Sequence, residues 1–129
     1  MTGKFLLDTN IVIALFAGEA EVSHAIARTE EVFLSSVVLG ELYYGARKSS
    51  RSTENLACTD TFASSNTVLG FSIPISRQYG AIKESLRAKG KMIPENDIWI
   101  AAVAIHYELT LATRDAHFIE IHGLLVAPW

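Results

Sequence analysis

Short apolar runs alternate with amphipathic stretches along this chain. Strands are predicted for the apolar runs at residues 5–7, 32–34, 68–75, 109–112 and 124–126, because each run is short and is bounded by turn-forming residues. Helices are predicted where apolar side chains recur at helical spacing, at residues 11–16, 20–29, 37–46, 53–64, 76–89 and 94–107, with a short helical turn at 117–121.

This alternation predicts an α/β fold. Short strands separated by helices are typical of βα units around a parallel sheet. The strands are apolar without interruption, which indicates that helices cover both faces of the sheet. We therefore expect three layers, α/β/α, with one central parallel sheet of four to five strands. The length of 129 residues, without a repeat or linker, predicts a single domain over 1–129.

Several residues mark the predicted ends of these elements. Ser35 precedes an amphipathic stretch and is expected to cap its helix. Pro74 is expected to end the strand at 68–75, and Ser76 to cap the helix that follows. Gly90 is expected to stop that helix.

Composition narrows the class of protein. Half of the residues are apolar and 19% are charged, as in globular domains. The longest apolar run, residues 98–105, is far shorter than the roughly 18 residues of a membrane-spanning helix. The start of the chain also lacks the apolar region of a secretory signal. We expect a cytoplasmic protein without a membrane segment.

Cysteine and histidine give no metal pattern. The single Cys58 cannot form an internal disulfide, and the four histidines lack a zinc spacing. The net charge of −3 provides no broad basic field, which counts against a nucleic-acid partner.

Acidic residues stand at the ends of predicted elements. Asp8 and Asp115 directly follow strands. Ligands of an open parallel sheet bind beyond the carboxyl ends of its strands, where the strand order reverses. Asp97 begins a helix and could reach the same rim, and Glu41 lies among apolar residues two turns into another helix.

Each acid also has a purely structural interpretation. Asp8 could form an Asx turn or cap the following helix. Asp97 is suited to an N-cap, Asp115 could close a turn, and Glu41 could be an ordinary exposed helix residue.

Four short motifs along the chain contain these acids. They are Leu7-Asp8-Thr9-Asn10, Ser35-x5-Glu41-Leu42-x-x-Gly45, Asn96-Asp97-x-x-Ile100-Ala101-Ala102 and Leu111-x-Thr113-Arg114-Asp115-x-x-Phe118. Together they resemble the motifs of PIN domains, and more narrowly those of the VapC toxins of bacterial and archaeal toxin–antitoxin pairs. The resemblance runs from about residue 5 to Trp129. Many relatives carry an acid at the place of His117, so no metal role is assigned to this histidine, and no histidine is expected as a general base.

The resemblance implies a site where the four acids cluster at one rim of the sheet. If the carboxylates approach to about 5 Å, each like-charge pair costs about 3 kcal/mol at an effective dielectric of about 20. A divalent cation removes this conflict, and oxygen ligands favour Mg²⁺ or Mn²⁺ over zinc. We expect Asp8 and Asp97 as direct ligands, and Glu41 and Asp115 as ligands directly or through water.

The expected reaction is hydrolysis of RNA phosphodiester bonds by a metal-bound water. Residues that could orient the carboxylates are Thr9, Asn10, Ser35 and Thr113, which could equally be turn and cap residues. Basic clusters that could grip RNA are Arg47, Lys48 and Arg51, and Lys83, Arg87, Lys89 and Lys91. Similarity to VapC toxins also implies a homodimer and a cognate antitoxin that covers the active site.

Three other interpretations stay open. The chain could be a free-standing PIN nuclease of RNA processing, which the motifs do not separate from a toxin. It could be a PIN fold that serves only as an interaction scaffold. A receiver-like signalling module fits poorly, because that class needs an aspartate at its third strand and a lysine on its last, and no lysine follows Lys91.

Overall fold

The computed structural model describes residues 3–129, so residues 1–2 of the predicted domain lie outside the described part. Five strands form one parallel sheet in the order β3-β2-β1-β4-β5. They are β1 (Lys4–Leu7), β2 (Glu31–Ser35), β3 (Thr67–Leu69), β4 (Thr110–Ala112) and β5 (Val126–Ala127). The predicted α/β fold with a parallel sheet is confirmed.

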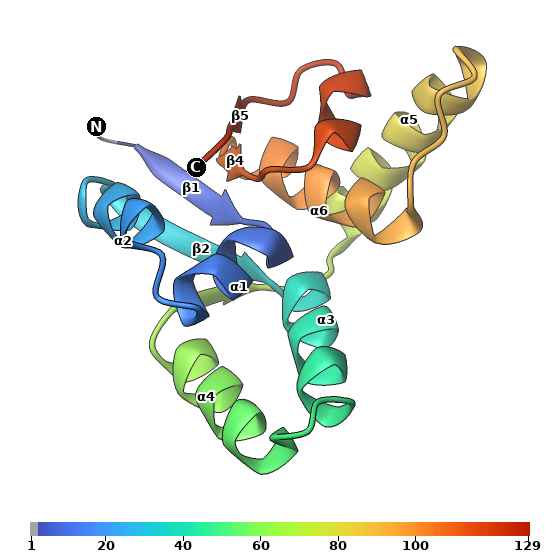
Figure 1. Cartoon of the computed structure of the whole chain (residues 1–129). Helices are drawn as coiled ribbons and strands as arrows, with labels where there is room; N and C mark the ends of the chain where they lie inside the picture. Colours follow the sequence, from blue (N-terminus) through green and yellow to red (C-terminus); the bar gives the residue numbers. More distant parts are fainter. Residues whose placement is uncertain (1–2) are drawn as a thin grey trace.

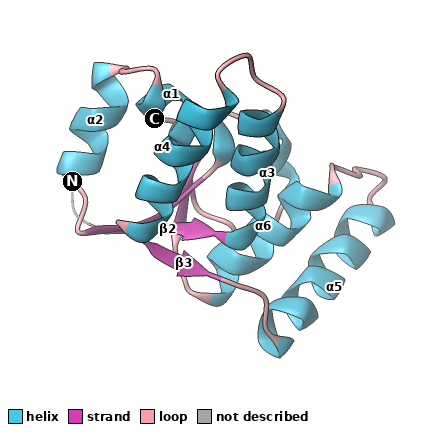
Figure 2. Cartoon of the chain, turned by 90° about the horizontal axis from the view of Figure 1, so that it is seen from below, coloured by secondary structure: helices cyan, strands magenta, loops and turns pink. Residues whose placement is uncertain are grey.

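Within residues 3–129, six α-helices and one short 3₁₀ helix connect the strands. They are α1 (Thr9–Phe16), α2 (Ala20–Ala27), α3 (Ser36–Arg47), α4 (Ser52–Ser64), α5 (Ile73–Ala88), α6 (Glu95–His106) and the 3₁₀ helix η1 (Ala116–Glu120). Helices α1 to α4 form one group and the pair α5 and α6 another (Figure 1). In the view from below, α3 packs against β2 and α4 packs against β3 (Figure 2).

The strand order reverses between β1 and β4. The chain moves from β1 outward to β2 and β3, then returns past β1 to β4 and β5. Right-handed crossovers in opposite directions place their helices on opposite faces of the sheet. The carboxyl ends of β1 and β4 thus form the point of reversal, where α/β folds open a crevice for ligands.

The buried core explains the most apolar part of the sequence. In α6, residues Ile98 and Ile100–Ala104 are all buried, so this helix is apolar on nearly every side. It packs against α5, α3 and β4. Within residues 3–129, no single helix is long and apolar enough to cross a membrane, and α1 and α2 pass that test only as a pair bent by 112°.

The boundary between β3 and α5 differs from the prediction. The strand ends at Leu69 and the helix begins at Ile73, not at residue 76. The cap is Ser72, whose Oγ accepts a hydrogen bond of 3.3 Å from Ile75 N. Pro74 therefore opens the helix, because a proline in the first turn lacks only an N–H that would be unpaired there. The predicted strand is confirmed but was predicted too long at its C-terminal end, and the predicted cap at Ser76 was wrong.

Other predicted boundaries agree better. Ser35 caps α3, since its Oγ accepts a hydrogen bond of 3.1 Å from Val38 N. Gly90 follows the end of α5 with φ of +67°, a conformation that favours glycine. The last strand occupies Val126–Ala127 and was predicted slightly too early.

Candidate active site

Asp8 lies at the carboxyl end of β1 and is the N-cap of α1. Its Oδ1 accepts a hydrogen bond of 2.9 Å from Thr9 N, and its Oδ2 accepts one of 2.7 Å from Thr113 Oγ1. The residue is 5% exposed. The capping interpretation is therefore confirmed, but it does not compete with a role in a site. The second carboxylate oxygen is held by a residue 105 positions away, at the end of β4.

Asp97 is the third residue of α6, so the alternative that it caps this helix is wrong. The N-cap position is Pro94, whose carbonyl oxygen accepts a hydrogen bond of 3.0 Å from Asp97 N. The side chain of Asp97 is consequently free for another purpose. It is only 13% exposed and turns toward the segment after β4.

Asp115 follows β4 and caps η1, where its Oδ1 accepts a hydrogen bond of 2.9 Å from His117 N. Its own backbone N–H donates to Thr113 Oγ1 at 3.0 Å. The turn interpretation is confirmed here too. As with Asp8, the local hydrogen bond fixes a carboxylate at the rim of the sheet.

Glu41 reaches the same rim from α3. Thr9 Oγ1 donates a hydrogen bond of 2.6 Å to Glu41 Oε1, and Asn96 Nδ2 donates one of 3.4 Å to Glu41 Oε2. These contacts join α3 to the starts of α1 and α6. Glu41 is thus tied into the cluster rather than being an ordinary exposed helix residue.

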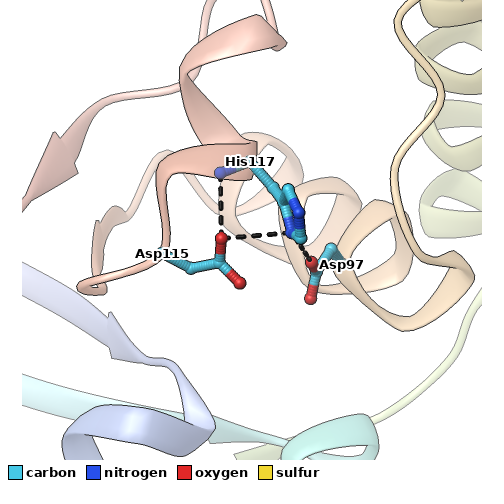
Figure 3. A group of neighbouring side chains, drawn as sticks. All are labelled: Asp97, Asp115 and His117. Carbon is cyan, nitrogen blue, oxygen red and sulfur yellow. Dashed lines mark hydrogen bonds and ion pairs between the residues drawn. The ribbon is translucent and has the colours of Figure 1, made fainter.

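His117 completes the cluster, and the sequence prediction missed it. Its Nδ1 lies 3.2 Å from Asp97 Oδ2 and 3.1 Å from Asp115 Oδ1 (Figure 3). One ligand atom from each of these three residues lies within 4.8 Å of the others. The sequence analysis assigned no metal role to His117, and the structure places its ring between two of the predicted acids.

Burial and mutual repulsion act on the two innermost carboxylates. Burial raises the pKa of Asp8, with smaller contributions from the charges of Glu41 and Asp115, against hydrogen bonds from Thr113 and Thr9 that lower it. Burial also raises the pKa of Asp97 to about 6, against the lowering effect of His117 and with a further rise from Asp8 and Asp115. The four predicted acids are therefore one electrostatic group.

Three of the four predicted orienting residues contact this group. Thr9 and Thr113 donate to carboxylates as described above. Asn10 Nδ2 lies 3.3 Å from Asp8 Oδ2, and Asn10 Oδ1 accepts a hydrogen bond of 3.2 Å from Arg114 N. Ser35 is fully buried and caps α3 through Val38 N, and among the described contacts it has none to a carboxylate.

The donor set fits a divalent cation. Asp97, Asp115 and His117 each offer a ligand atom within 4.8 Å of the others, and burial disfavours the charged forms of Asp8 and Asp97. A cation would reverse that cost, because opposite charge nearby stabilises a carboxylate. Asp97, Asp115 and His117 form this group, Asp8 acts on Asp97 through its charge, and Glu41 acts in the same way on Asp8.

Some of the basic residues that could contact RNA form ion pairs within the protein instead. Arg114 does not meet a neighbouring acid of the cluster but pairs with Glu19 at 3.0 Å and donates to Trp129 O at 2.8 Å. Lys83 pairs with Glu95 at 2.9 Å. Trp99 stacks on Tyr79 with ring centroids 4.0 Å apart, so this ring packs within the protein.

Comparison with known proteins gives the same result along nearly the whole chain. The PIN domain model matches residues 5–124. The chain is 36% identical over 119 residues to ribonuclease VapC2 of Haemophilus influenzae, covering 91% of this chain and 90% of that protein. It is 33% identical over 129 residues to the tRNA(fMet)-specific endonuclease VapC of Shigella flexneri, covering 98% of both.

Solved structures agree. A chain of VapBC2 from Rickettsia felis, bound to a DNA fragment from its promoter, superposes with a TM-score of 0.89 at 30% identity and covers 98% of both chains. A chain of DNA-bound VapBC from Salmonella typhimurium gives the same score at 30% identity and 96% coverage of both. The protein therefore belongs to the PIN-domain family, and within it to the VapC-type ribonucleases of toxin–antitoxin systems.

Proposed function

We propose that this protein is a metal-dependent endoribonuclease whose active site is formed by Asp8, Glu41, Asp97 and Asp115. One observation supports this above all. Four acids from four separate segments meet where the strand order reverses, and the two innermost ones have raised pKa values. Nothing in the packing of the core requires such a group, since carboxylates are rarely brought together in proteins without a partner.

The proposed cofactor is Mg²⁺ or Mn²⁺, which would supply an activated water and neutralise charge on the phosphate. The chain's own residues prepare the carboxylates for it. Thr9 N and Thr113 Oγ1 fix both oxygens of Asp8. Thr9 Oγ1 holds Glu41. These donors lock the geometry in advance, so that little reorganisation is needed when substrate binds.

The proposed partners are an RNA substrate and a cognate antitoxin. An apolar groove between α1, α3 and α4 supports the antitoxin, because Ile13 and Phe16 are 56% and 39% exposed there and Glu41 lies at its edge. A peptide segment in this groove could reach the site directly. Solved relatives were captured as VapBC complexes.

We further propose that the protein forms a homodimer and acts in the cytoplasm. Three large apolar side chains, Tyr44, Phe71 and Ile73, are 66%, 59% and 76% exposed. Tyr44 and Phe71 border one depression with Trp99. Burying these side chains between two copies would remove apolar surface from water. Sedimentation analysis of the purified chain tests this, and a monomer at all concentrations would contradict it.

Cleavage of total RNA by the purified chain tests the activity, with Mg²⁺ or Mn²⁺ added to the wild type, Asp8→Asn and Asp60→Asn. Asp60 is the matched control, since it is an exposed aspartate on α4 outside the cluster. We expect metal-dependent cleavage by the wild type and Asp60→Asn, and none by Asp8→Asn. Equal cleavage by Asp8→Asn would contradict the assignment of the site.

The alternatives are separated by two further results. Growth arrest on expression, relieved by a neighbouring small partner protein, would favour a toxin over a free-standing nuclease of RNA processing. If the wild type binds Mg²⁺ or Mn²⁺ but cleaves no RNA, this would favour a PIN fold that serves only as an interaction scaffold.

A further inference from the structure

His117 stands where an oxygen ligand could stand, yet it offers a nitrogen. Its ring enters the space between Asp97 and Asp115 from η1 (Figure 3). The side chain is 51% exposed, so the fold does not need it for packing. Its backbone is fixed by the hydrogen bond from His117 N to Asp115 Oδ1 at 2.9 Å. The carboxylate of Asp115 therefore holds both the main chain and the ring of His117 at the cluster.

The distances around the ring match those of a coordination shell. In an octahedral shell with bonds of about 2.1 Å, neighbouring ligand atoms lie about 3 Å apart. His117 Nδ1 lies 3.2 Å from Asp97 Oδ2 and 3.1 Å from Asp115 Oδ1. The three ligand atoms all lie within 4.8 Å of one another, so one cation could bind all three.

We propose that His117 Nδ1 is a direct metal ligand beside Asp97 and Asp115, and that this nitrogen makes the site select Mn²⁺ over Mg²⁺. The inference rests on the proposed metal-dependent function and specifies which cation that site prefers. Mg²⁺ is a hard cation that takes oxygen ligands. Imidazole nitrogen is instead a ligand of transition-metal ions.

Charge acts in the same direction. A neutral imidazole in place of a carboxylate removes one negative charge from the site. Mg²⁺ loses that attraction without compensation, because it gains little from nitrogen. Mn²⁺ regains part of it through the bond to Nδ1. The selectivity should therefore depend on His117 and not on the four acids alone.

The opposing possibility is that His117 takes the place of the cation. A protonated ring could neutralise Asp97 and Asp115 by itself, and a metal ion would then have to displace it. The two possibilities predict opposite effects of removing the ring. As a ligand, His117 strengthens Mn²⁺ binding; as a competitor, it weakens Mn²⁺ binding.

Pulsed electron paramagnetic resonance of the full chain loaded with Mn²⁺ tests the proposal directly. We expect nitrogen hyperfine coupling from an imidazole in the wild type, and its loss in His117→Ala. The matched control is His122→Ala, an exposed histidine of the same segment that borders a separate depression. This control should keep the coupling.

Titration calorimetry with Mn²⁺ and Mg²⁺ gives the selectivity. His117→Ala should weaken Mn²⁺ binding at least about tenfold, since even indirect supporting residues of metal sites contribute that much. It should change Mg²⁺ binding less, and His117→Asp should shift the preference toward Mg²⁺. The wild-type spectrum stands as a test even if a variant fails to fold.

Wild-type protein that binds Mn²⁺ without nitrogen coupling would overturn the proposal, and so would tighter Mn²⁺ binding by His117→Ala. Neither result would affect the proposed ribonuclease, which depends on RNA cleavage and on Asp8→Asn. Conversely, nitrogen coupling in a protein that cleaves no RNA would support the ligand assignment and remove the proposed activity.

Discussion

The two sides of the acid cluster are built differently. On the side of β1, Asp8 is buried, and donors from Thr9 and Thr113 fix both of its oxygens. On the side of α6 and η1, Asp97 has His117 as its side-chain partner, and Asp115 is one-third exposed. The first carboxylate is preorganised by neutral donors. Asp97 and Asp115 are both held by the imidazole ring of His117, whose Nδ1 could also bind a cation.

This difference indicates a division of work. Neutral N–H and O–H donors orient a carboxylate without neutralising it, so Asp8 keeps its attraction for a cation while its geometry is fixed. Burial raises the pKa of Asp97 to about 6, even though His117 lowers it, and the charges of Asp8 and Asp115 raise it further. Metal should therefore matter most to the side of Asp97.

The largest effect is expected for Asp97→Asn, which removes a central charge. RNA cleavage should fall by more than about a hundredfold, because even supporting residues of metal sites contribute about 10–100-fold. Initial rates of RNA cleavage under saturating metal measure this. Asp60→Asn again serves as the control. An Asp97→Asn rate within a few-fold of the wild-type rate would contradict a central role of Asp97.

The next largest effect is expected for Thr113→Val. The substitution keeps the shape of the buried side chain but removes the donor to Asp8 Oδ2. Metal affinity and cleavage should fall about 10–100-fold. Thr110→Val, on the same strand, is the control. Calorimetric metal binding by both variants measures the difference, and equal affinities would mean that Asp8 needs no orienting donor.

Thr9→Val should have a smaller effect than Thr113→Val. It removes the hydroxyl donor to Glu41, but Thr9 N still bonds Asp8 and Asn96 still contacts Glu41. We expect a loss of cleavage of up to about tenfold. Parallel rate measurements on the two variants decide the order, and a larger loss in Thr9→Val would mean that the donor to Glu41 matters more than the donor to Asp8.

The smallest effect concerns stability without metal. The pKa of Asp97 is raised from 3.8 to about 6 in the folded protein. Between these values the folded state binds more protons than the unfolded state, so its stability falls as pH rises through this window. Asp97→Asn should remove this fall and stabilise the metal-free protein at pH 7 by on the order of 1–3 kcal/mol.

Urea unfolding of the wild type and Asp97→Asn in chelator, at pH 4.5 and at pH 7, measures that change. The two curves should lie closer together at the lower pH, where Asp97 is protonated in the folded protein, and should converge only below its unfolded pKa of 3.8. Added Mn²⁺ should restore the stability of the wild type at pH 7, because carboxylates bind metal in the deprotonated form. A wild type that grows steadily more stable over this range without metal would contradict the raised pKa.

The places of Asp8 and Asp115 at the edge of the sheet were predictable from the sequence. Asp8 and Asp115 directly follow parallel strands, whose carboxyl ends share one edge of the sheet. The boundary at Ile73 was not predictable from hydrophobicity, since an apolar run continues from β3 into the first turn of α5.

The role of His117 was equally hidden. Nothing in the linear sequence shows that a 3₁₀ turn directs its ring back between Asp97 and Asp115. A two-residue spacing from Asp115 fits many geometries, and Asp97 belongs to a different helix. Convergence of this kind depends on how η1 packs on α6, which hydrophobic patterning does not specify.

A crystal structure of the chain soaked in Mn²⁺, with anomalous diffraction to locate the ion, tests the central claim most directly. We expect an anomalous peak between Asp8, Asp97 and Asp115, within coordination distance of their carboxylate oxygens. Ordered Mn²⁺ only elsewhere on the surface, with these carboxylates apart and solvated, would contradict it.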